Sequence, residues 1–191
     1  MMMKTSTPYL RLVTPPASAP VTLAEAKAFL RLDHDAEDDA IARMVAAAVE
    51  ALDGRHGFLG RALEASTWEL TLDRFPCAEL QLPIGPVVCV ESVKYTDTAG
   101  AEATVSAGDY EVDATPTFLG WIVPTGAWPA TMETVNAVRV RFVAGQGTPE
   151  PVKQAILDMV ANRYDRRGEA KMLTPGVVSD LSPYRRPVVL G

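Results

Sequence analysis

The sequence predicts a mixed α+β fold, with helical segments toward both ends of the chain and strands between them. Apolar side chains recur at three-to-four residue spacing over residues 36–53 and 151–167, as in helices that bury one face. Between them, residues 67–143 contain runs in which apolar and polar residues alternate, which is typical of strands with one buried face. These strand runs carry no residues that indicate chemistry, so we interpret them as a scaffold.

Length and composition fit one folded domain with appendages. The chain has 191 residues, of which 48% are hydrophobic and 22% charged, which is ordinary for a folded protein. We expect an N-terminal arm at 1–20, a single domain at 21–167 and a C-terminal tail at 168–191. The net charge of −6 argues against a general phosphate-backbone binder, but not against a protein that lets DNA pass without gripping it.

Cellular location follows from what the sequence lacks. No apolar run reaches the roughly 20 residues of a membrane span, and prolines break the N-terminal segment where a signal peptide needs a continuous apolar core. We therefore expect a soluble protein of the cytoplasm, or of a particle assembled there, with no membrane partner. Cys77 and Cys89 have no metal-ligand spacing and are expected to be buried, reduced thiols.

The N-terminal part predicts an arm followed by two helices. Prolines in residues 1–20 prevent a regular helix and disfavour a central strand. Thr22 and Glu25 have the spacing of a capping box, which predicts a helix over 22–31. Residues 36–53 open with acidic side chains that suit the positive end of a helix dipole, and this segment is the second predicted helix.

The remaining elements follow in order. Strand patterns occur near residues 67–72, 80–82, 88–95, 110–112, 120–123 and 136–143. Pro151 suits the first turn of a third helix over 151–167. The tail holds apolar clusters separated by prolines, so we expect a partner surface to complete it.

One tetrapeptide is suggestive of an enzyme. His34 lies between Asp33 and Asp35 and could ligate a metal. A helix–helix link in which an aspartate caps the next helix is the preferred interpretation. His56 is the only other histidine, so one chain cannot supply a multi-histidine site.

Other chemical motifs are weak or missing. Asp38 and Asp39, with Glu37, could suggest a divalent-ion site, but the alternating oxygen ligands of a calcium loop are absent, and a dipole-matched helix start is preferred. No Gly-x-Ser-x-Gly elbow, phosphate loop or GxGxxG motif occurs. We predict no catalytic, cofactor-binding or metal-ligating residues and no cofactor.

The C-terminal part is basic although the chain is acidic. The residues are Arg163, Arg166, Arg167, Lys171, Arg185 and Arg186. They could form a nucleic-acid patch, but a docking surface for an acidic neighbour or charge matched to a helix C-terminus is preferred. Trp68, Trp121 and Trp128 are interpreted as core or interface anchors.

An ordered set of features spans the chain from about Val21 to Arg167. It comprises Thr22-Leu-Ala-Glu-Ala-Lys27, Leu30-Arg31, Asp38-Asp39, Ile41, Thr67-Trp-Glu-Leu70, Phe75-Pro76, Leu82-Pro83, Pro86-Val87, Val93-Lys-Tyr95, Asp97, Gly100, Tyr110, Trp128-Pro129, Ala144-Gly145, Pro151-Val-Lys-Gln-Ala-Ile156, Tyr164 and Arg166. The set resembles the head–tail connector (adaptor, or head-completion) proteins of tailed bacteriophages and phage-derived gene transfer agents.

This resemblance implies a small helical bundle, with two N-terminal helices and one C-terminal helix, that carries an inserted antiparallel β-sheet region. It also implies a structural protein without catalytic residues. Such subunits form homo-oligomeric rings of about twelve copies below the portal protein, extend the DNA channel and dock the next neck, stopper or tail protein. The chain's acidic balance suits a channel wall that repels DNA if those acids face inward.

Two surfaces are expected to carry this assembly. A cyclic ring needs a heterologous interface, and we assign it to Met44, Val45, Ala48 and Leu52. Portal or neighbour docking is assigned to Tyr164, Arg166, Arg167, Leu173, Val177, Tyr184, Arg185 and Arg186. Two alternatives stay open: a nucleic-acid module that uses the C-terminal basic cluster, and a metal-dependent hydrolase that uses Asp33, His34, Asp38 and His56.

Overall fold

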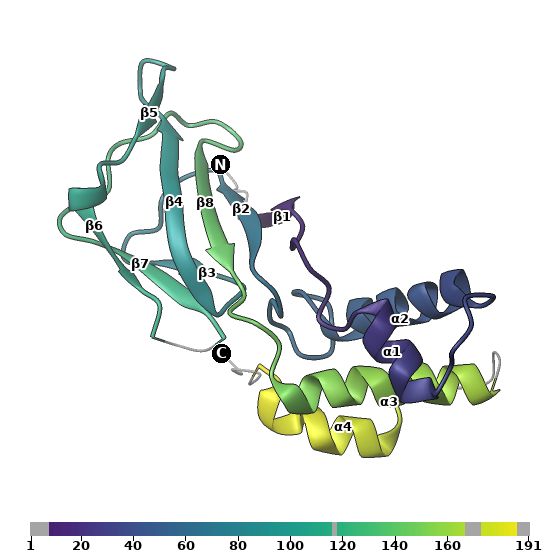
Figure 1. The fold of residues 1–191 in the computed structure, drawn as a ribbon. Coiled ribbons are helices and arrows are strands. Elements are labelled where there is room, and N and C mark those ends of the chain that lie inside the picture. The colour runs from purple at the N-terminus through teal and green to yellow at the C-terminus, as the bar shows by residue number, and fades with distance from the viewer. Residues whose placement is uncertain (1–7, 116–117, 167–172, 187–191) are drawn as a thin grey trace. The chain divides into compact units, whose positions relative to one another are not determined.

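The computed structural model describes residues 8–115, 118–166 and 173–186. The chain divides into two compact units (Figure 1). The β unit comprises Met1–Ala17 and Ala65–Gln146, and the helical unit comprises Ser18–Glu64 and Gly147–Gly191. The sheet region is thus inserted between the N-terminal and C-terminal helices, which confirms the predicted α+β class and helical bundle with an inserted antiparallel sheet.

The helical unit contains α1 (Leu23–Leu30), α2 (Asp38–Leu52), α3 (Glu150–Arg166), α4 (Pro175–Leu181) and the short 3-10 helix η2 (Ser182–Tyr184). The predicted capping box is present. The Glu25 backbone N–H donates to Thr22 Oγ1 over 3.2 Å, and Thr22 N–H donates to Glu25 Oε2 over 2.7 Å. These bonds satisfy two N–H groups that a helix start would otherwise leave unpaired.

The core of the helical unit lies between α2 and α3. The apolar stripe of α2 is buried there, and α3 contributes its own stripe: Ile41, Val45, Ala48 and Leu52 from α2, and Val152, Ala155, Ile156, Met159 and Val160 from α3. The sequence pattern predicted both stripes. Burying each large apolar side chain stabilises the unit by roughly 1.5–3 kcal/mol.

The β unit contains two antiparallel sheets. The strands are β1 (Tyr9–Thr14), β2 (Ser66–Leu72), β3 (Leu80–Leu82), β4 (Val87–Thr96), β5 (Glu102–Thr104), β6 (Tyr110–Asp113), β7 (Gly120–Pro124) and β8 (Val138–Ala144), with the 3-10 helix η1 at Ala107–Asp109. The larger sheet has the order β1-β2-β8-β4-β5 and the smaller β3-β7-β6. β8 occupies the centre of the larger sheet (Figure 1).

Each sheet buries apolar side chains on one of its faces. On β8, Val138, Val140 and Phe142 are fully buried, whereas Arg139 and Arg141 between them are exposed, as the alternation predicts. In the smaller sheet, Ile122 lies opposite Leu80, and both are buried. A Cβ atom added to Gly120 of β7 would lie 2.5 Å from Val87 Cγ2 of β4. The apolar faces of the two sheets therefore share one core, and their polar faces point away from each other.

The predicted arm contains a strand. Residues 9–14 form β1, which pairs with β2 at the edge of the larger sheet. An edge strand bonds along one side only, which is why a segment flanked by prolines can adopt it. Residues 9–14 of the predicted arm are therefore regular, and its irregular part is shorter than residues 1–20.

The described part of the tail also has structure within the chain. Pro175 lies in the first turn of α4, and Val177 and Leu181 are buried in the core of the helical unit. The chain itself therefore covers Val177 and Leu181, in place of the predicted partner surface.

The prediction of buried cysteines is wrong. Cys77 and Cys89 are free and exposed. Cys77 lies in the β2–β3 connection. Cys89 lies opposite Val143, and register shifts between Val87 and Cys89 and between Val90 and Ser92 change which β4 side chains face outward. A strict alternation read from the sequence cannot follow such bulges.

Candidate interaction surfaces

The acidic link between α1 and α2 is held by a lysine. Lys27 Nζ pairs with Asp35 and with Asp38 Oδ1, the latter over 2.7 Å. The hydrogen bonds that Lys27 donates to Asp35, and then to Asp38, raise the pKa of Lys27, and the Lys27 ammonium lowers the pKa of Asp35. These carboxylates thus join the end of α1 to the start of α2, in line with the preferred structural interpretation of the link.

The four residues of the hydrolase alternative do not gather. Asp38 begins α2, and His56 follows its last residue, Leu52. The 15 residues of the helix, at about 1.5 Å each, separate the two by roughly 20 Å. Within the described ranges, no group of three or more His, Cys, Asp and Glu side chains could hold a metal ion.

The residues assigned to the subunit interface belong to the chain's own core. Val45 is 6% exposed, and Ala48 and Leu52 are fully buried, while Met44 is half-buried against the same cluster. The assignment is therefore corrected, because an apolar helical stripe indicates burial without showing whether the partner is the same chain or another.

The residues assigned to portal docking divide into internal and external groups. Tyr164 is half-buried and donates to Glu37, and Val177 is buried. Leu173 and Tyr184 pack against the helical core.

The remaining assigned residues are arginines. Arg166 and Arg185 are exposed, and the Arg185 guanidinium lies 4.9 Å from the Phe58 ring centroid. Arg186 is half-buried and donates its backbone N–H to Leu59 O, and Arg167 lies outside the described residues.

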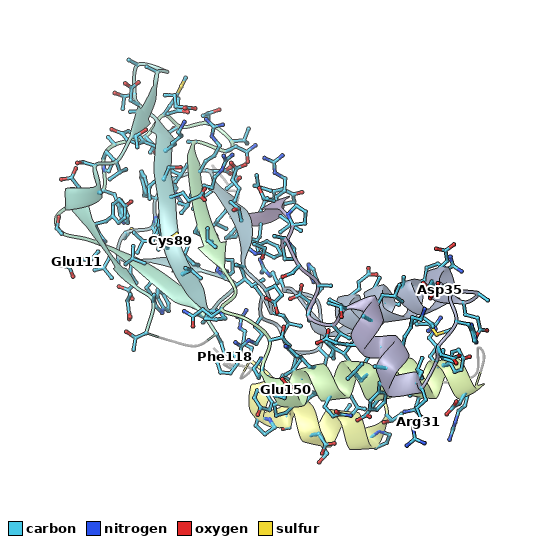
Figure 2. The ribbon with its side chains drawn as sticks, in the orientation of Figure 1. Arg31, Asp35, Cys89, Glu111, Phe118 and Glu150 are labelled. Carbon is cyan, nitrogen blue, oxygen red and sulfur yellow. The ribbon has the colours of Figure 1, made fainter. Side chains whose placement is uncertain are left out.

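The described members of the C-terminal basic cluster do not form one patch, and Arg167 and Lys171 lie outside the described residues. Arg163 and Arg166 lie in the last turn of α3. Arg185 and Arg186 lie beside residues 58–60. This is the end of the helical unit where α3 begins, because the Gly147 N–H, shortly before α3, donates to Leu63 O. Figure 2 shows Glu150 at that end and Asp35 at the other. The 17 residues of α3 thus separate the two groups by roughly 25 Å, which weakens the nucleic-acid alternative.

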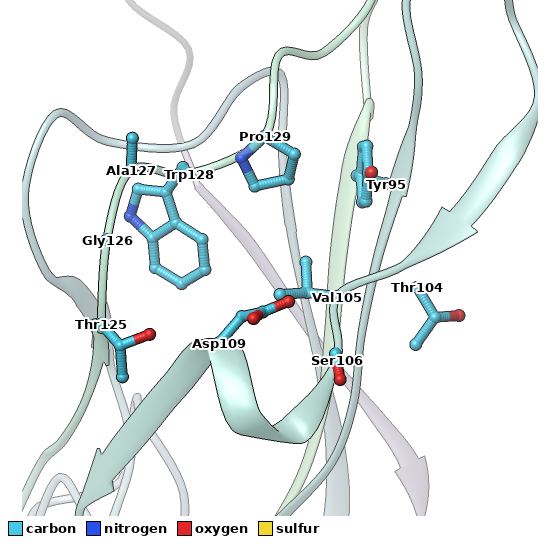
Figure 3. A pocket seen from close by; sticks show the side chains of 10 residues that line it. All are labelled: Tyr95, Thr104, Val105, Ser106, Asp109, Thr125, Gly126, Ala127, Trp128 and Pro129. Atoms are coloured by element: carbon cyan, nitrogen blue, oxygen red, sulfur yellow. The ribbon is translucent and has the colours of Figure 1, made fainter.

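A cavity of about 400 Å³ lies in the β unit, between the β5–β6 region and the β7–β8 loop (Figure 3). Trp128 lines one side; its ring stacks on Phe75, with centroids 4.5 Å apart, and its Nε1–H donates to Ala78 O. Asp109 and Tyr95 are the ionisable side chains among the lining residues. The cavity wall therefore has hydroxyl and aromatic groups without a paired acid and base.

The polar face of the larger sheet is cationic. Six charged side chains form two triads across five strands: Arg11, Glu69 and Arg141 in one, and Lys94, Glu102 and Arg139 in the other. We call these six residues the cationic face. It carries four positive and two negative charges. It also holds four of the five lysines and arginines in the described part of the β unit, the fifth being Arg74.

Each triad is arranged around a carboxylate. Glu69 accepts from Arg11 over 2.7 Å and from Arg141 over 3.1 Å. Burial opposes the ionisation of Glu69, but the hydrogen bonds from Arg141 and Arg11 outweigh it and lower its pKa. Glu102 accepts from Lys94 over 2.9 Å and also contacts Arg139, and its pKa is lowered by Lys94 first. The sequence showed Arg139 and Arg141 facing outward, but strand register is needed to bring Arg11 and Lys94 to them.

The polar face of the smaller sheet is acidic. Ile122 points into the core, so Trp121 and Val123 beside it point outward, and register places Asp113 and Glu111 opposite them. Gln81 lies opposite Trp121 on the other side. These five residues, which we call the acidic face, combine two carboxylates with a partly exposed indole and a Val123 side chain that is 41% exposed. Glu111 is labelled in Figure 2.

Comparison with protein families gives one decisive match. The family model described as phage gp6-like head–tail connector protein matches residues 20–120, which is more than half of the chain. The chain belongs to this family. The match confirms the resemblance drawn from the sequence, and it covers α1, α2 and strands β2 to β6 of the connector fold.

Solved structures similar to this connector come from gene transfer agent (GTA) particles. A chain in the neck of an empty GTA particle, computed with C6 symmetry, is 29% identical, with a TM-score of 0.77 over 96% of this connector and 98% of that chain. A chain in the virion of a native GTA particle is 28% identical, with a TM-score of 0.76 over 95% and 97%. A chain in the neck of a native GTA particle, computed with C12 symmetry, is 27% identical, with a TM-score of 0.73 over 96% and 98%.

No curated protein matches this connector in sequence. Within the described residues, none of the helices is long and apolar enough to cross a membrane.

Proposed function

We propose that this connector is a ring subunit in the neck of a phage or gene transfer particle. The ring sits under the portal, continues the DNA channel and provides the platform for the next neck, stopper or tail protein. The observation that carries the proposal is the match over 96% of this chain and 98% of a GTA neck chain at 29% identity. The C6 and C12 symmetries of the matched necks support about twelve copies around one axis.

The proposed role is structural, with no catalysis and no cofactor. The family is defined by a connector role, and the candidate metal ligands Asp35 and Asp38 instead pair with Lys27. The net charge of −6 suits a wall along which DNA slides without specific binding. Assembly in the host cytoplasm and a final place in the particle neck belong to the same proposal.

Portal docking is proposed for the exposed members of the C-terminal set. Arg166 and Arg185 are exposed, whereas Val177 and Leu181 are structural. Exposed arginines suit an acidic neighbour, since the guanidinium binds carboxylates in a forked geometry. Removing the whole tail would also remove α4 from the core, so point variants test the surface more cleanly.

The experiment measures the mass of the purified chain by light scattering, alone and with the portal protein of the same particle. A ring-sized species in either condition is expected. A chain that stays monomeric in both and does not bind the portal would overturn the proposal. Arg185→Glu and Arg166→Glu are expected to weaken portal binding, with Arg43→Glu on the exposed side of α2 as the matched control.

A further inference from the structure

The two polar faces of the β unit carry opposite charge. The cationic face sums to +2, from four cations and two carboxylates. The acidic face sums to −2, from Glu111 and Asp113. Both belong to the same compact unit, and the shared core places them on opposite sides of it. Two complementary faces on opposite sides of one body are what a head-to-tail repeat needs.

We propose that the cationic face of one subunit docks on the acidic face of the next copy of this chain, and that this contact closes the ring. The inference rests on the proposed function and adds the surfaces to it. The occupant is a second copy because that copy presents the complementary charge. Charge also selects the mode of association, since cationic-to-cationic or acidic-to-acidic pairing would oppose like charges and disfavour a two-fold dimer.

The side chains on each face suit such a contact. Arg11, Arg139 and Arg141 have side chains between 44% and 57% exposed, so their guanidinium groups can reach carboxylates of a neighbour while still bonded to Glu69 or Glu102. On the acidic face, Trp121 and Val123 add apolar area beside the two carboxylates. Aromatic residues and arginine are enriched at the centres of protein interfaces.

Charge reversal provides a test with an internal rescue. Arg139→Glu/Arg141→Glu changes the cationic face from +2 to −2, and Glu111→Lys/Asp113→Lys changes the acidic face from −2 to +2. Each variant alone is expected to lose the ring at concentrations where the wild-type chain is assembled. An equimolar mixture is expected to regain it, because each reversed face then meets a complementary face on the other variant.

The two variants must alternate around each ring in that mixture. Native mass spectrometry should therefore find equal numbers of subunits of each variant in a ring. Arg74→Glu and Glu133→Lys make the same kinds of charge reversal, one site at a time and so at half the size, at exposed positions of the β unit outside the two faces. Both are expected to assemble normally. Tryptophan fluorescence establishes that each variant is folded. If the reversed cationic face does not fold, Arg139→Gln/Arg141→Gln is expected to weaken the ring with a smaller salt dependence.

The possible outcomes distinguish the docking of these two faces from the proposed function. Rings formed equally well by wild type and both reversed variants would overturn this inference and leave the proposed function standing. Loss in both variants without rescue on mixing would also overturn the pairing of these two faces. A wild-type chain that forms no ring, alone or with the portal protein, would overturn both. Duplex DNA binding that Arg139→Gln/Arg141→Gln abolishes while the ring persists would assign the cationic face to nucleic acid.

Discussion

Gly120 of β7 lies directly against Val87 of β4, so the two sheets approach each other closely at this point. A Cβ atom on Gly120 would lie 2.5 Å from Val87 Cγ2 and 3.1 Å from Val87 Cβ. Val87 is fully buried, and its β-branched side chain has few alternative rotamers. The contact lies between the sheet that carries the acidic face and the sheet that carries the cationic face, so it bears on both the fold and the proposed ring.

Gly120→Ala is therefore expected to destabilise the β unit by about 1–3 kcal/mol, as overpacking in a dense core does. All three tryptophans belong to this unit, so urea unfolding followed by tryptophan fluorescence measures its stability separately. Gly108→Ala is the matched control, because nothing lies within 4 Å of the added Cβ atom there. Equal unfolding midpoints for the two variants would contradict the close approach.

Leu181→Ala tests whether the tail belongs to the helical core. Leu181 is fully buried in the cluster that includes Ile156 and Met159, and truncating a buried leucine costs roughly 2–5 kcal/mol. The loss is expected in the helical unit, measured by circular dichroism at 222 nm during urea unfolding. Ser179→Ala, at an exposed position of the same helix, is expected to change little. A Leu181→Ala protein as stable as wild type would show that α4 packs only weakly.

Local patterns were sufficient for most of the fold. Thr22 and Glu25 bonded as the capping box predicts, and Val138, Val140 and Phe142 are buried as the alternation predicts. Such features depend on residues close in sequence. β1 was missed because an edge strand bonds on one side only and leaves a weak pattern. Thr174-Pro175 carried a usable signal for α4, since Thr174 accepts from Val177 N–H and Pro175 fits the first turn.

The interaction surfaces could not be predicted to the same degree. The stripe containing Val45, Ala48 and Leu52 predicts burial, but the sequence does not say against what, and the structure places it in the chain's own core. The cationic face depends on pairing β1 with β2 and β4 with β8, between residues as far apart as Arg11 and Arg141. Register between distant strands is a tertiary property, so no local pattern could assemble this face.

Metal removal should have no effect on stability. Asp35 and Asp38 already pair with Lys27, and His56 lies beyond the far end of α2. The thermal unfolding midpoint is expected to be the same with and without EDTA and to be unchanged by added Zn²⁺. Lys27→Met, which leaves the two aspartates unpaired, is expected to lower it. A midpoint that falls with EDTA in the wild-type protein would revive the hydrolase alternative.

Acid should weaken the β unit through Glu69. The Glu69 pKa lies below its ordinary value of 4.5 in the folded state because Arg141 and Arg11 bond the carboxylate. A carboxylate with a lowered folded pKa contributes stability that is complete above the unfolded value and is lost as pH falls through the folded value. Glu69→Gln should therefore be less stable than wild type near neutral pH, and the difference should shrink as pH falls below 4.5.

The measurement is urea unfolding by tryptophan fluorescence at a series of pH values from neutral downward. Glu102 also has a lowered pKa, but it is present in both proteins, so its contribution cancels in the difference. Glu91→Gln, at an exposed position on β4 between Val90 and Ser92, is the matched control and should follow the wild-type pH profile. If the loss of stability in Glu69→Gln has the same size at every pH, the glutamate acts by shape and hydrogen bonding alone. Its charge then does not stabilise the pairing of β1 and β8 with β2.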